Sequence, residues 1–309
     1  MIKLVLQERK KVMNIKKIDI HAHCLLFPQY APKYPENGCT MPSAETLIDF
    51  YDRLGIERGV LLPITSPEAQ PTTMTNEACK FLSDSHPDRF LWFCNVDPRA
   101  FENTRDANLG YLLEHYVSLG AKGVGELTAN LYTDDPKVDN LFSFCEEMGL
   151  PVTIHIAPAS EGYYGIIDEL GLPRLEKMLK KHPRLKIFGH SQCFWSEIGE
   201  NSEDTRCTWP TGKVKNGRLT ELLRNYENLY CDMSARSGAY AMMRDREHAA
   251  RFIEEFADKI MYGCDICAAV NVFPFEFSDF LESMRTSGEI SEMNYRKLVR
   301  ENAVRLLNL

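Results

Sequence analysis

The sequence lacks the features by which proteins hold nucleic acids or membranes. Its 309 residues carry a formal net charge of -8, with neither a run of basic residues nor a basic stripe at helical spacing. A surface that binds phosphate backbones is normally positive, so a nucleic-acid partner is disfavoured. No apolar run approaches the roughly 18 residues that a membrane-spanning helix requires. We therefore expect a small-molecule partner, with no nucleic acid and no membrane.

The sequence also lacks the marks of an oxidising compartment. Its 10 cysteines are not spaced like those of a small disulfide-bonded domain. Cys264 and Cys267 form a single CxxC without a second pair, and we interpret it as incidental. The first dozen residues are too charged and too short in apolar sequence for a secretory signal. We expect residues 1–14 to be a weakly ordered N-terminal extension and the protein to be cytoplasmic.

The chain does contain a regular alternation of short β-rich runs and amphipathic helical stretches. Eight such units follow one another without a linker or a break in composition. This pattern predicts an α/β fold in which residues 15–309 form a single (β/α)8 TIM barrel. The alternative is a doubly wound sheet, which would want a glycine-rich turn after the first strand. The expected strands lie at residues 18–24, 59–64, 90–96, 121–127, 151–156, 185–190, 228–233 and 259–265.

The first expected strand carries two histidines, His21 and His23. Alternate side chains of a strand point to the same side, so Asp19, His21 and His23 should share one face. Both imidazoles could then bind a single divalent ion. Because HxH alone is a weak motif, the competing interpretation is a pair of hydrogen-bonded core histidines.

Further histidines and acids end the other expected strands. His155 and His190 end the fifth and sixth strands, and Glu126 and Asp265 end the fourth and eighth. In a barrel these ends form the rim where active sites lie, and an unpaired buried carboxylate is costly there. Asp232, which ends the seventh strand, is interpreted as structural because the following turn can satisfy its hydrogen bonds. The predicted metal-site residues are His21, His23, Glu126, His155, His190 and Asp265.

These residues resemble the amidohydrolase superfamily, and the surrounding segments resemble its amidohydrolase-2 branch, which includes aminocarboxymuconate-semialdehyde decarboxylase-like enzymes. The segments are GHSQCFWSEI, NLYCDMSARSG, YGCDIC and ENAVRLL. The resemblance covers residues 18–309. It implies that His21, His23 and His155 are metal ligands. It further implies that Asp265 is a ligand and proton acceptor, and that His190 is either a ligand of a second metal or a free catalytic imidazole.

The donor set bears on the identity and number of the ions. Imidazoles and carboxylates without a placed thiolate favour Zn²⁺, with Mn²⁺ or Fe²⁺ as alternatives. Some members of the superfamily carry a carbamylated lysine on the fourth strand, where this sequence has Glu126. That glutamate is similar to the bridging glutamate of TatD-type and adenine-deaminase-type sites, which leaves one or two ions open.

This set of residues favours a hydrolase. A bound divalent ion lowers the pKa of its water from about 16 to near 7. Asp265 would take the remaining proton, and His190 would polarise the scissile carbonyl or hold a second ion. We expect hydrolysis of an amide, lactone or ester of a small anionic substrate. The alternatives are a non-hydrolytic lyase, a decarboxylase or hydratase of an aromatic or unsaturated carboxylic acid, and a barrel that binds metal or ligand without turnover.

Residues 191–216 follow the sixth strand and are too numerous for a plain connection, so we expect a lid above the site. Arg206 in this loop and Arg236 after the seventh strand could meet an anionic group. The aromatic candidates for substrate contact are Tyr163, Tyr164, Phe194, Trp195 and Trp209. The alternative is that the aromatics of the loop anchor it to the barrel. A homodimer is the expected assembly, although no stripe of residues indicates its interface.

Overall fold

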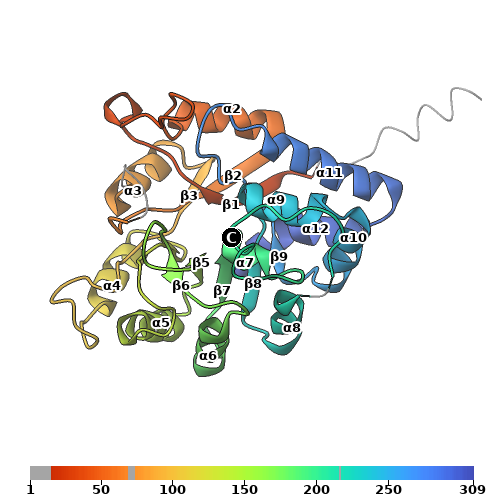
Figure 1. Ribbon diagram of the computed structural model, residues 1–309. Helices are drawn as coiled ribbons and strands as arrows, with labels where there is room; N and C mark the ends of the chain where they lie inside the picture. Colours follow the sequence, from red (N-terminus) through yellow and green to blue (C-terminus); the bar gives the residue numbers. More distant parts are fainter. Residues whose placement is uncertain (1–14, 69–73, 216) are drawn as a thin grey trace, which may run out of the picture.

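The computed structural model describes residues 15–68, 74–215 and 217–309, which form a ring of parallel strands surrounded by helices (Figure 1). The predicted extension, residues 1–14, lies outside this part of the chain. The ring strands are β1 (Lys17–Ala22), β2 (Ile56–Leu61), β3 (Phe90–Trp92), β4 (Val124–Leu127), β5 (Val152–Ala157), β7 (Ile187–His190), β8 (Leu229–Asp232) and β9 (Ile260–Met261). The additional strand β6 (Ile166–Ile167) pairs with β5 beside the ring. The predicted (β/α)8 barrel is confirmed.

Short contacts close the ring where the regular pairing stops. The strands pair in parallel in the orders β1-β2-β3 and β4-β5-β7-β8-β9. A bridge between Cys94 and Val124 joins β3 to β4. At the other seam, the backbone N–H of Asp265 donates to the carbonyl of His21 at 2.9 Å. This bond places Asp265, which follows the short strand β9, directly beside the end of β1.

Helices lie around the ring and at its ends. They are α2 (Ala44–Leu54), α3 (Asn76–Ser85), α4 (Gly110–Ser118), α5 (Pro136–Met148), α6 (Pro173–Lys181), α7 (Gln192–Ser196), α8 (Arg218–Asn225), α9 (Ala235–Met243), α10 (Arg246–Glu255), α11 (Phe273–Ser287), α12 (Glu292–Arg296) and α13 (Asn302–Leu307). Several begin at a side-chain cap. Ser43 accepts a hydrogen bond from the N–H of Thr46 at the start of α2, for example. Within the described residues, none of the helices has both the length and the apolar character needed to span a bilayer.

The interior of the ring is closed at one end by the C-terminal helix. Strand residues such as Ile18, Val60 and Phe188 form an apolar cluster with Leu306 and Leu307 of α13. In Figure 1 the C-terminus accordingly lies over the middle of the ring. Ile18 precedes His21 in β1, and Phe188 precedes His190 in β7, so the opposite end of the ring is left for polar side chains.

Strand β1 departs from the alternation that its sequence predicts. Its pairing with β2 shifts register between Asp19 and Ala22, as at a β-bulge. Asp19 accepts a hydrogen bond from the hydroxyl of Tyr51 on α2 at 2.8 Å, so it faces the helix layer. The prediction that Asp19 shares a face with His21 and His23 is therefore wrong, because the irregularity shifts the histidines relative to it.

Candidate metal centre

The six predicted ligands come together at the carboxyl ends of the strands. The Nε2 atoms of His21 and His23 lie 3.1 Å apart. The Nε2 atom of His23 is 3.5 Å from Glu126 Oε2 and 3.5 Å from Asp265 Oδ1. Donor atoms that share one ion at about 2.1 Å stand roughly 3.0 to 3.4 Å from each other. These spacings are therefore close to those of a single metal centre.

Hydrogen bonds fix which nitrogen each histidine turns inward. The Nδ1 atom of His21 lies 2.6 Å from Asp232 Oδ2, and that of His23 lies 3.0 Å from the carbonyl of Leu62. Both acceptors favour a proton on Nδ1, which leaves a lone pair on each Nε2. Two buried lone pairs 3.1 Å apart repel each other unless a cation or a proton lies between them. The donor set therefore fits a divalent cation.

The charges of the cluster are arranged to attract a cation. Burial opposes protonation of His21, but Asp232 and Asp265 outweigh it and raise the pKa of His21 well above its usual value. Burial also disfavours the ionised form of Glu126, yet the imidazole of His155 holds the pKa of that carboxyl well below its usual range. Glu126 therefore stays ionised in the barrel, and its charge draws positive charge toward the histidines.

Asp232 has a larger part in the site than its sequence context indicated. Its Oδ1 accepts the N–H of Ser234 at 3.0 Å, as expected of a residue that stabilises the following turn. Its Oδ2 also holds His21. Burial acts to raise the pKa of Asp232, but the charge of His21 lowers it below the usual value. The sequence feature that could have revealed this role is the position of Asp232 at the end of a strand, a position that the predicted ligands share.

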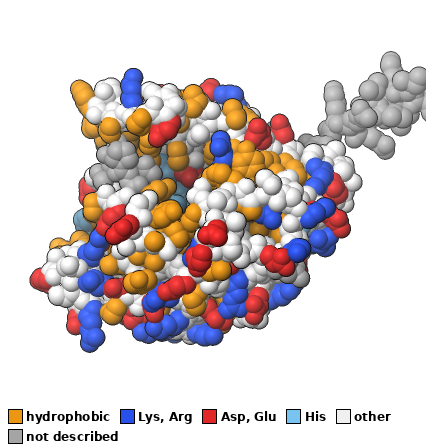
Figure 2. Space-filling model, viewed as in Figure 1, with side chains coloured by type: hydrophobic (Ala, Val, Ile, Leu, Met, Phe, Trp, Pro, Cys, Tyr) orange, Lys and Arg blue, Asp and Glu red, His pale blue; other side chains and the backbone are white. Residues whose placement is uncertain are grey.

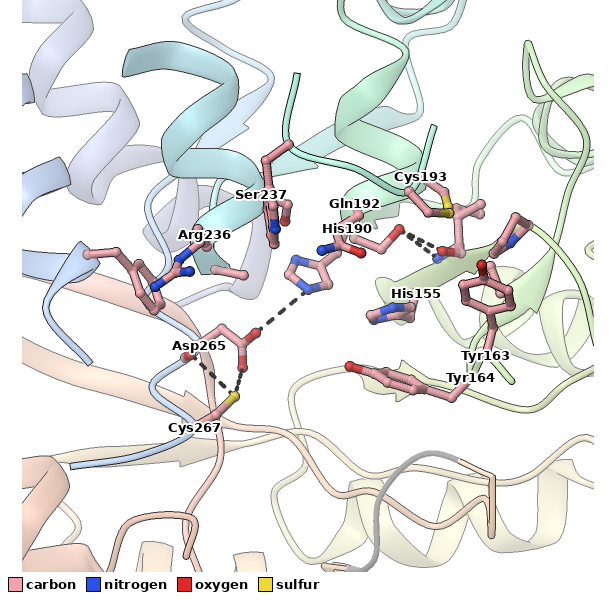
Figure 3. Close-up of a pocket in the computed structure, with 18 of the residues that line it drawn as sticks. His155, Tyr163, Tyr164, His190, Gln192, Cys193, Arg236, Ser237, Asp265 and Cys267 are labelled. Carbon is pink, nitrogen blue, oxygen red and sulfur yellow. Dashed lines mark hydrogen bonds and ion pairs between the residues drawn. The ribbon is translucent and has the colours of Figure 1, made fainter. Parts of the chain in front are cut away.

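His155 and His190 stand beside this cluster and face a cavity. The Nδ1 atom of His155 is 2.7 Å from Glu126 Oε1. The Nδ1 atom of His190 is 3.0 Å from the hydroxyl of Ser234, and its Nε2 lies 3.9 Å from Asp265 Oδ2. Figure 3 shows His155, His190 and Asp265 directed toward the same space. Burial, together with the charge of His21, lowers the pKa of His190 to about 4, so this imidazole is neutral at pH 7.

The cavity has a volume of about 310 Å³ and combines polar and aromatic walls. Besides His155, His190 and Asp265, its lining includes Tyr163, Tyr164, Gln192, Cys193, Cys207, Trp209, Arg236, Cys267 and Phe273. Arg236 is exposed, and no acid in the described part of the chain forms an ion pair with it. Its guanidinium is therefore available to an anion that enters the cavity.

Three of the predicted substrate contacts lie outside the cavity wall. Phe194 and Trp195 are buried and are not part of the cavity wall. The indole N–H of Trp195 donates to the carbonyl of Asp232 at 2.9 Å, so these rings anchor α7 to the barrel. Arg206 is also buried, and its Nη1 lies 3.4 Å from Glu203 Oε2. Of the seven residues predicted to contact substrate, the cavity includes four, namely Arg236, Tyr163, Tyr164 and Trp209.

Sequence reasoning missed several residues of the cavity wall. Gln192, Cys193, Cys207 and Phe273 carried no recognisable signal, because nothing in the pattern of a loop or a helix end fixes which side chains turn toward a cavity. Cys267 belongs to the CxxC interpreted as incidental, yet its thiol donates to Asp265 Oδ1 at 3.2 Å.

Known proteins share the family and the fold. Residues 18–309 match the family model described as Amidohydrolase. No curated protein matches the chain. The 2,6-dihydroxybenzoate decarboxylase from Rhizobium is 18% identical with a TM-score of 0.60, over 95% of this chain and 98% of that one. A probable 2-pyrone-4,6-dicarboxylic acid hydrolase from Acinetobacter baumannii, solved with citric acid bound, is 16% identical with a TM-score of 0.59, over 95% and 100%. The 5-carboxyvanillate decarboxylase from Novosphingobium aromaticivorans, complexed with manganese and a nitrobenzoic acid, is 18% identical with a TM-score of 0.58, over 95% and 96%.

Proposed function

The chain belongs to the amidohydrolase family, and from this premise we propose that it is a metal-dependent hydrolase that opens a lactone, ester or amide bond in a small, flat carboxylic acid. The observation that carries the proposal is a pair of carboxylate–histidine couples beside His21 and His23. Glu126 is bonded to His155, Asp265 lies 3.9 Å from His190, and His155, His190 and Asp265 line one cavity. Hydrolysis needs a group that takes a proton from water and returns a proton to the leaving group, and a second group that orients the carbonyl.

The residues that would hold the cation are those whose donor atoms lie closest together, namely His21, His23, Glu126 and Asp265. When bound, a divalent cation acts as a Lewis acid that stabilises negative charge on a substrate oxygen. The donor set suits Zn²⁺ and also Mn²⁺, the ion in the 5-carboxyvanillate decarboxylase structure. His155, a ligand by the family resemblance, supports this set through its bond to Glu126.

Two side chains would handle protons. Asp265 accepts the proton of the attacking water and passes it to the leaving oxygen. Its backbone is in the left-handed region, with φ 48, and its N–H is tied to His21, which fixes the direction of the carboxylate. His190 is neutral and is held by Ser234, so its Nε2 can orient the scissile carbonyl group beside Asp265.

The cavity wall favours a flat substrate with a negative charge. Tyr163, Tyr164, Trp209 and Phe273 provide aromatic surface on which an unsaturated ring can stack. Arg236 can pair with a carboxylate through two parallel hydrogen bonds. The similar proteins whose names state a substrate act on acids of this shape, 2,6-dihydroxybenzoate and 2-pyrone-4,6-dicarboxylic acid.

Decarboxylation of an aromatic acid is the second candidate. It is favoured by the same aromatic wall and by the names of the similar decarboxylases. In that reaction His190 or Asp265 would deliver one proton to the ring carbon that loses carbon dioxide, and the other residue would have no part in proton transfer. Hydrolysis gives a role to both, because Asp265 moves the proton while His190 orients the carbonyl group, which is why we place it first.

One assay separates these candidates. The purified protein, loaded with Zn²⁺ or Mn²⁺, is incubated with pyrone carboxylates and with hydroxybenzoates, and ring absorbance and carbon dioxide are followed together. We expect loss of the pyrone absorbance without carbon dioxide, abolished by a chelator and restored by the metal. Release of carbon dioxide would replace hydrolysis by decarboxylation. Turnover that survives complete removal of the metal would contradict both.

A further inference from the structure

Two cysteines of the cavity wall lie on consecutive segments of the chain. Cys193 belongs to α7, and Cys207 lies in the loop after it. Cys193 is buried, whereas Cys207 is half-buried and so more accessible from the cavity. Their thiols hydrogen-bond to each other. The proposed reaction uses neither residue.

The surroundings shift the pKa values of the two thiols in opposite directions. The hydrogen bond from Cys193 lowers the pKa of Cys207 against the effect of burial, and the charge of Arg206 lowers it further. The same hydrogen bond raises the pKa of Cys193, and burial adds to the rise. Because the thiolate is the reactive form of cysteine, Cys207 is the better nucleophile and Cys193 retains its proton.

Arg206 supplies a second, independent observation. Its side chain is 1% exposed, yet its Nε and Nη2 have no hydrogen-bond partner in the described part of the chain. A buried guanidinium with unpaired N–H groups is costly, and a nearby negative charge offsets that cost. Arg206 precedes Cys207 directly and acts electrostatically on both thiols. A thiolate at Cys207 would give this cation the partner that it lacks.

We propose that Cys207 and Cys193 form a reversible disulfide in the cavity wall when a hydroperoxide enters. The thiolate of Cys207 attacks one peroxide oxygen, the O–O bond breaks, and the departing hydroxide takes up a proton to become water. The sulfur of Cys193 then attacks the resulting sulfenic acid, the S–O bond breaks, and the hydroxyl leaves as water with the proton of Cys193. Two thiols lose two electrons in total, and one hydrogen peroxide becomes two waters.

The bond would tie two parts of the cavity wall together. Cys193 is three residues beyond His190, and Cys207 is two residues before Trp209. Oxidation would therefore join the start of α7 to the loop that carries an aromatic wall residue. The site is distinct from the metal cluster, and its chemistry requires neither metal nor substrate.

The sequence offers a direct chemical test, because trypsin cuts after Arg206 and separates the two cysteines into peptides 187–206 and 207–213. The full-length protein is treated with one equivalent of hydrogen peroxide, its remaining thiols are alkylated, and the digest is analysed by mass spectrometry. We expect a linked pair of these peptides that dithiothreitol separates. We also expect it to form about tenfold faster than oxidation at Cys39, a half-buried cysteine outside the cavity.

Variants make the outcome decisive. In C193S the sulfenic acid at Cys207 should persist and be trapped by dimedone, whereas C39S should form the linked pair at the wild-type rate. Circular dichroism verifies that each variant is folded. If the linked pair is absent while Cys39 is oxidised, or if dimedone labels Cys193 in C207S as fast as it labels Cys207 in C193S, the proposal is overturned. Because the readout is a peptide mass, its failure is independent of any failure of the proposed hydrolysis.

Discussion

At the scale of single residues, the site depends on what each side chain is bonded to on its far side. Asp232 and the carbonyl of Leu62 turn the Nε2 atoms of His21 and His23 inward. Ser234 does the same for His190. A metal-binding or proton-transferring group is effective only when its rotamer is held in this way.

Asp265 provides the sharpest test among the residues. The D265N variant cannot accept a proton, so kcat/KM should fall by about 10² to 10⁴. D204N, which alters an exposed acid in the loop after α7, is the matched control and should leave kcat/KM unchanged. Steady-state kinetics with the substrate found in the assay measure both values. Equal activity of D265N and wild type would remove Asp265 from the mechanism.

Arg236 should affect substrate binding rather than the chemical step. R236Q loses a charged hydrogen-bond donor at the cavity, and KM should rise by about 10- to 100-fold while kcat changes little. R251Q, on the exposed face of α10, serves as control because its pair with Glu247 is remote from the cavity. A fall in kcat at unchanged KM would show that Arg236 does not anchor the substrate.

At the scale of elements, the sequence predicts well where strands end and poorly how loops turn. Several strands have an apolar run that leads to a polar residue near the carboxyl end, and this pattern places Glu126, His155 and His190. The segment after β7 was expected to be a loop, but residues 192–196 form a helical turn. Helical geometry turns Phe194 and Trp195 toward the barrel.

The register shift in β1 could not be predicted from the sequence either. Regular alternation along the strand would put Asp19 on the same face as the histidines. Only the pairing with β2 shows that the alternation is interrupted. A bulge depends on the neighbouring strand, which a local pattern does not include. Long-range pairing likewise decides that Asp232 holds His21.

Asp245 tests the attachment of one helix. It caps α10 by accepting the N–H of His248 at 3.3 Å, and it accepts the N–H of Val214 at 2.9 Å. D245A should therefore lower the free energy of unfolding at pH 7 by about 1 to 2 kcal/mol. D245N retains one acceptor oxygen and should lose less. Urea titrations of the three proteins measure the differences.

The same carboxyl gives a pH dependence with a defined sign. Burial acts to raise the pKa of Asp245, but the N–H of Val214 and the charge of Lys213 lower it to about 2. A folded-state pKa below the unfolded value of about 3.9 stabilises the protein above that pH, and the contribution is lost as pH falls toward 2. The unfolding free energies of wild type and D245A should converge between pH 4 and pH 2. A constant difference would mean that the ionised carboxyl contributes nothing.

At the scale of the whole molecule, the site exists only when the ring is closed. Its residues come from the ends of β1, β4, β5, β7 and β9, and the β1–β9 seam brings Asp265 to the histidines. A cation that binds only this assembled arrangement must stabilise the folded barrel by mass action.

Metal binding should therefore appear as thermal stability. Added Zn²⁺ or Mn²⁺ at 100 times its Kd should raise the free energy of unfolding by about 2.7 kcal/mol over the chelated protein. A melting series over metal concentration measures the effect, and H23A should lose most of it. An equal response from H23A would place the stabilising ion elsewhere.

The most direct measurement is anomalous scattering from crystals grown with Zn²⁺ or Mn²⁺. The account predicts a peak at the barrel mouth, about 2.0 to 2.2 Å from the Nε2 atoms of His21 and His23. Carboxylate oxygens of Glu126 or Asp265 should complete its coordination. A map with no peak between these side chains, or with metal only at the protein surface, would contradict the account.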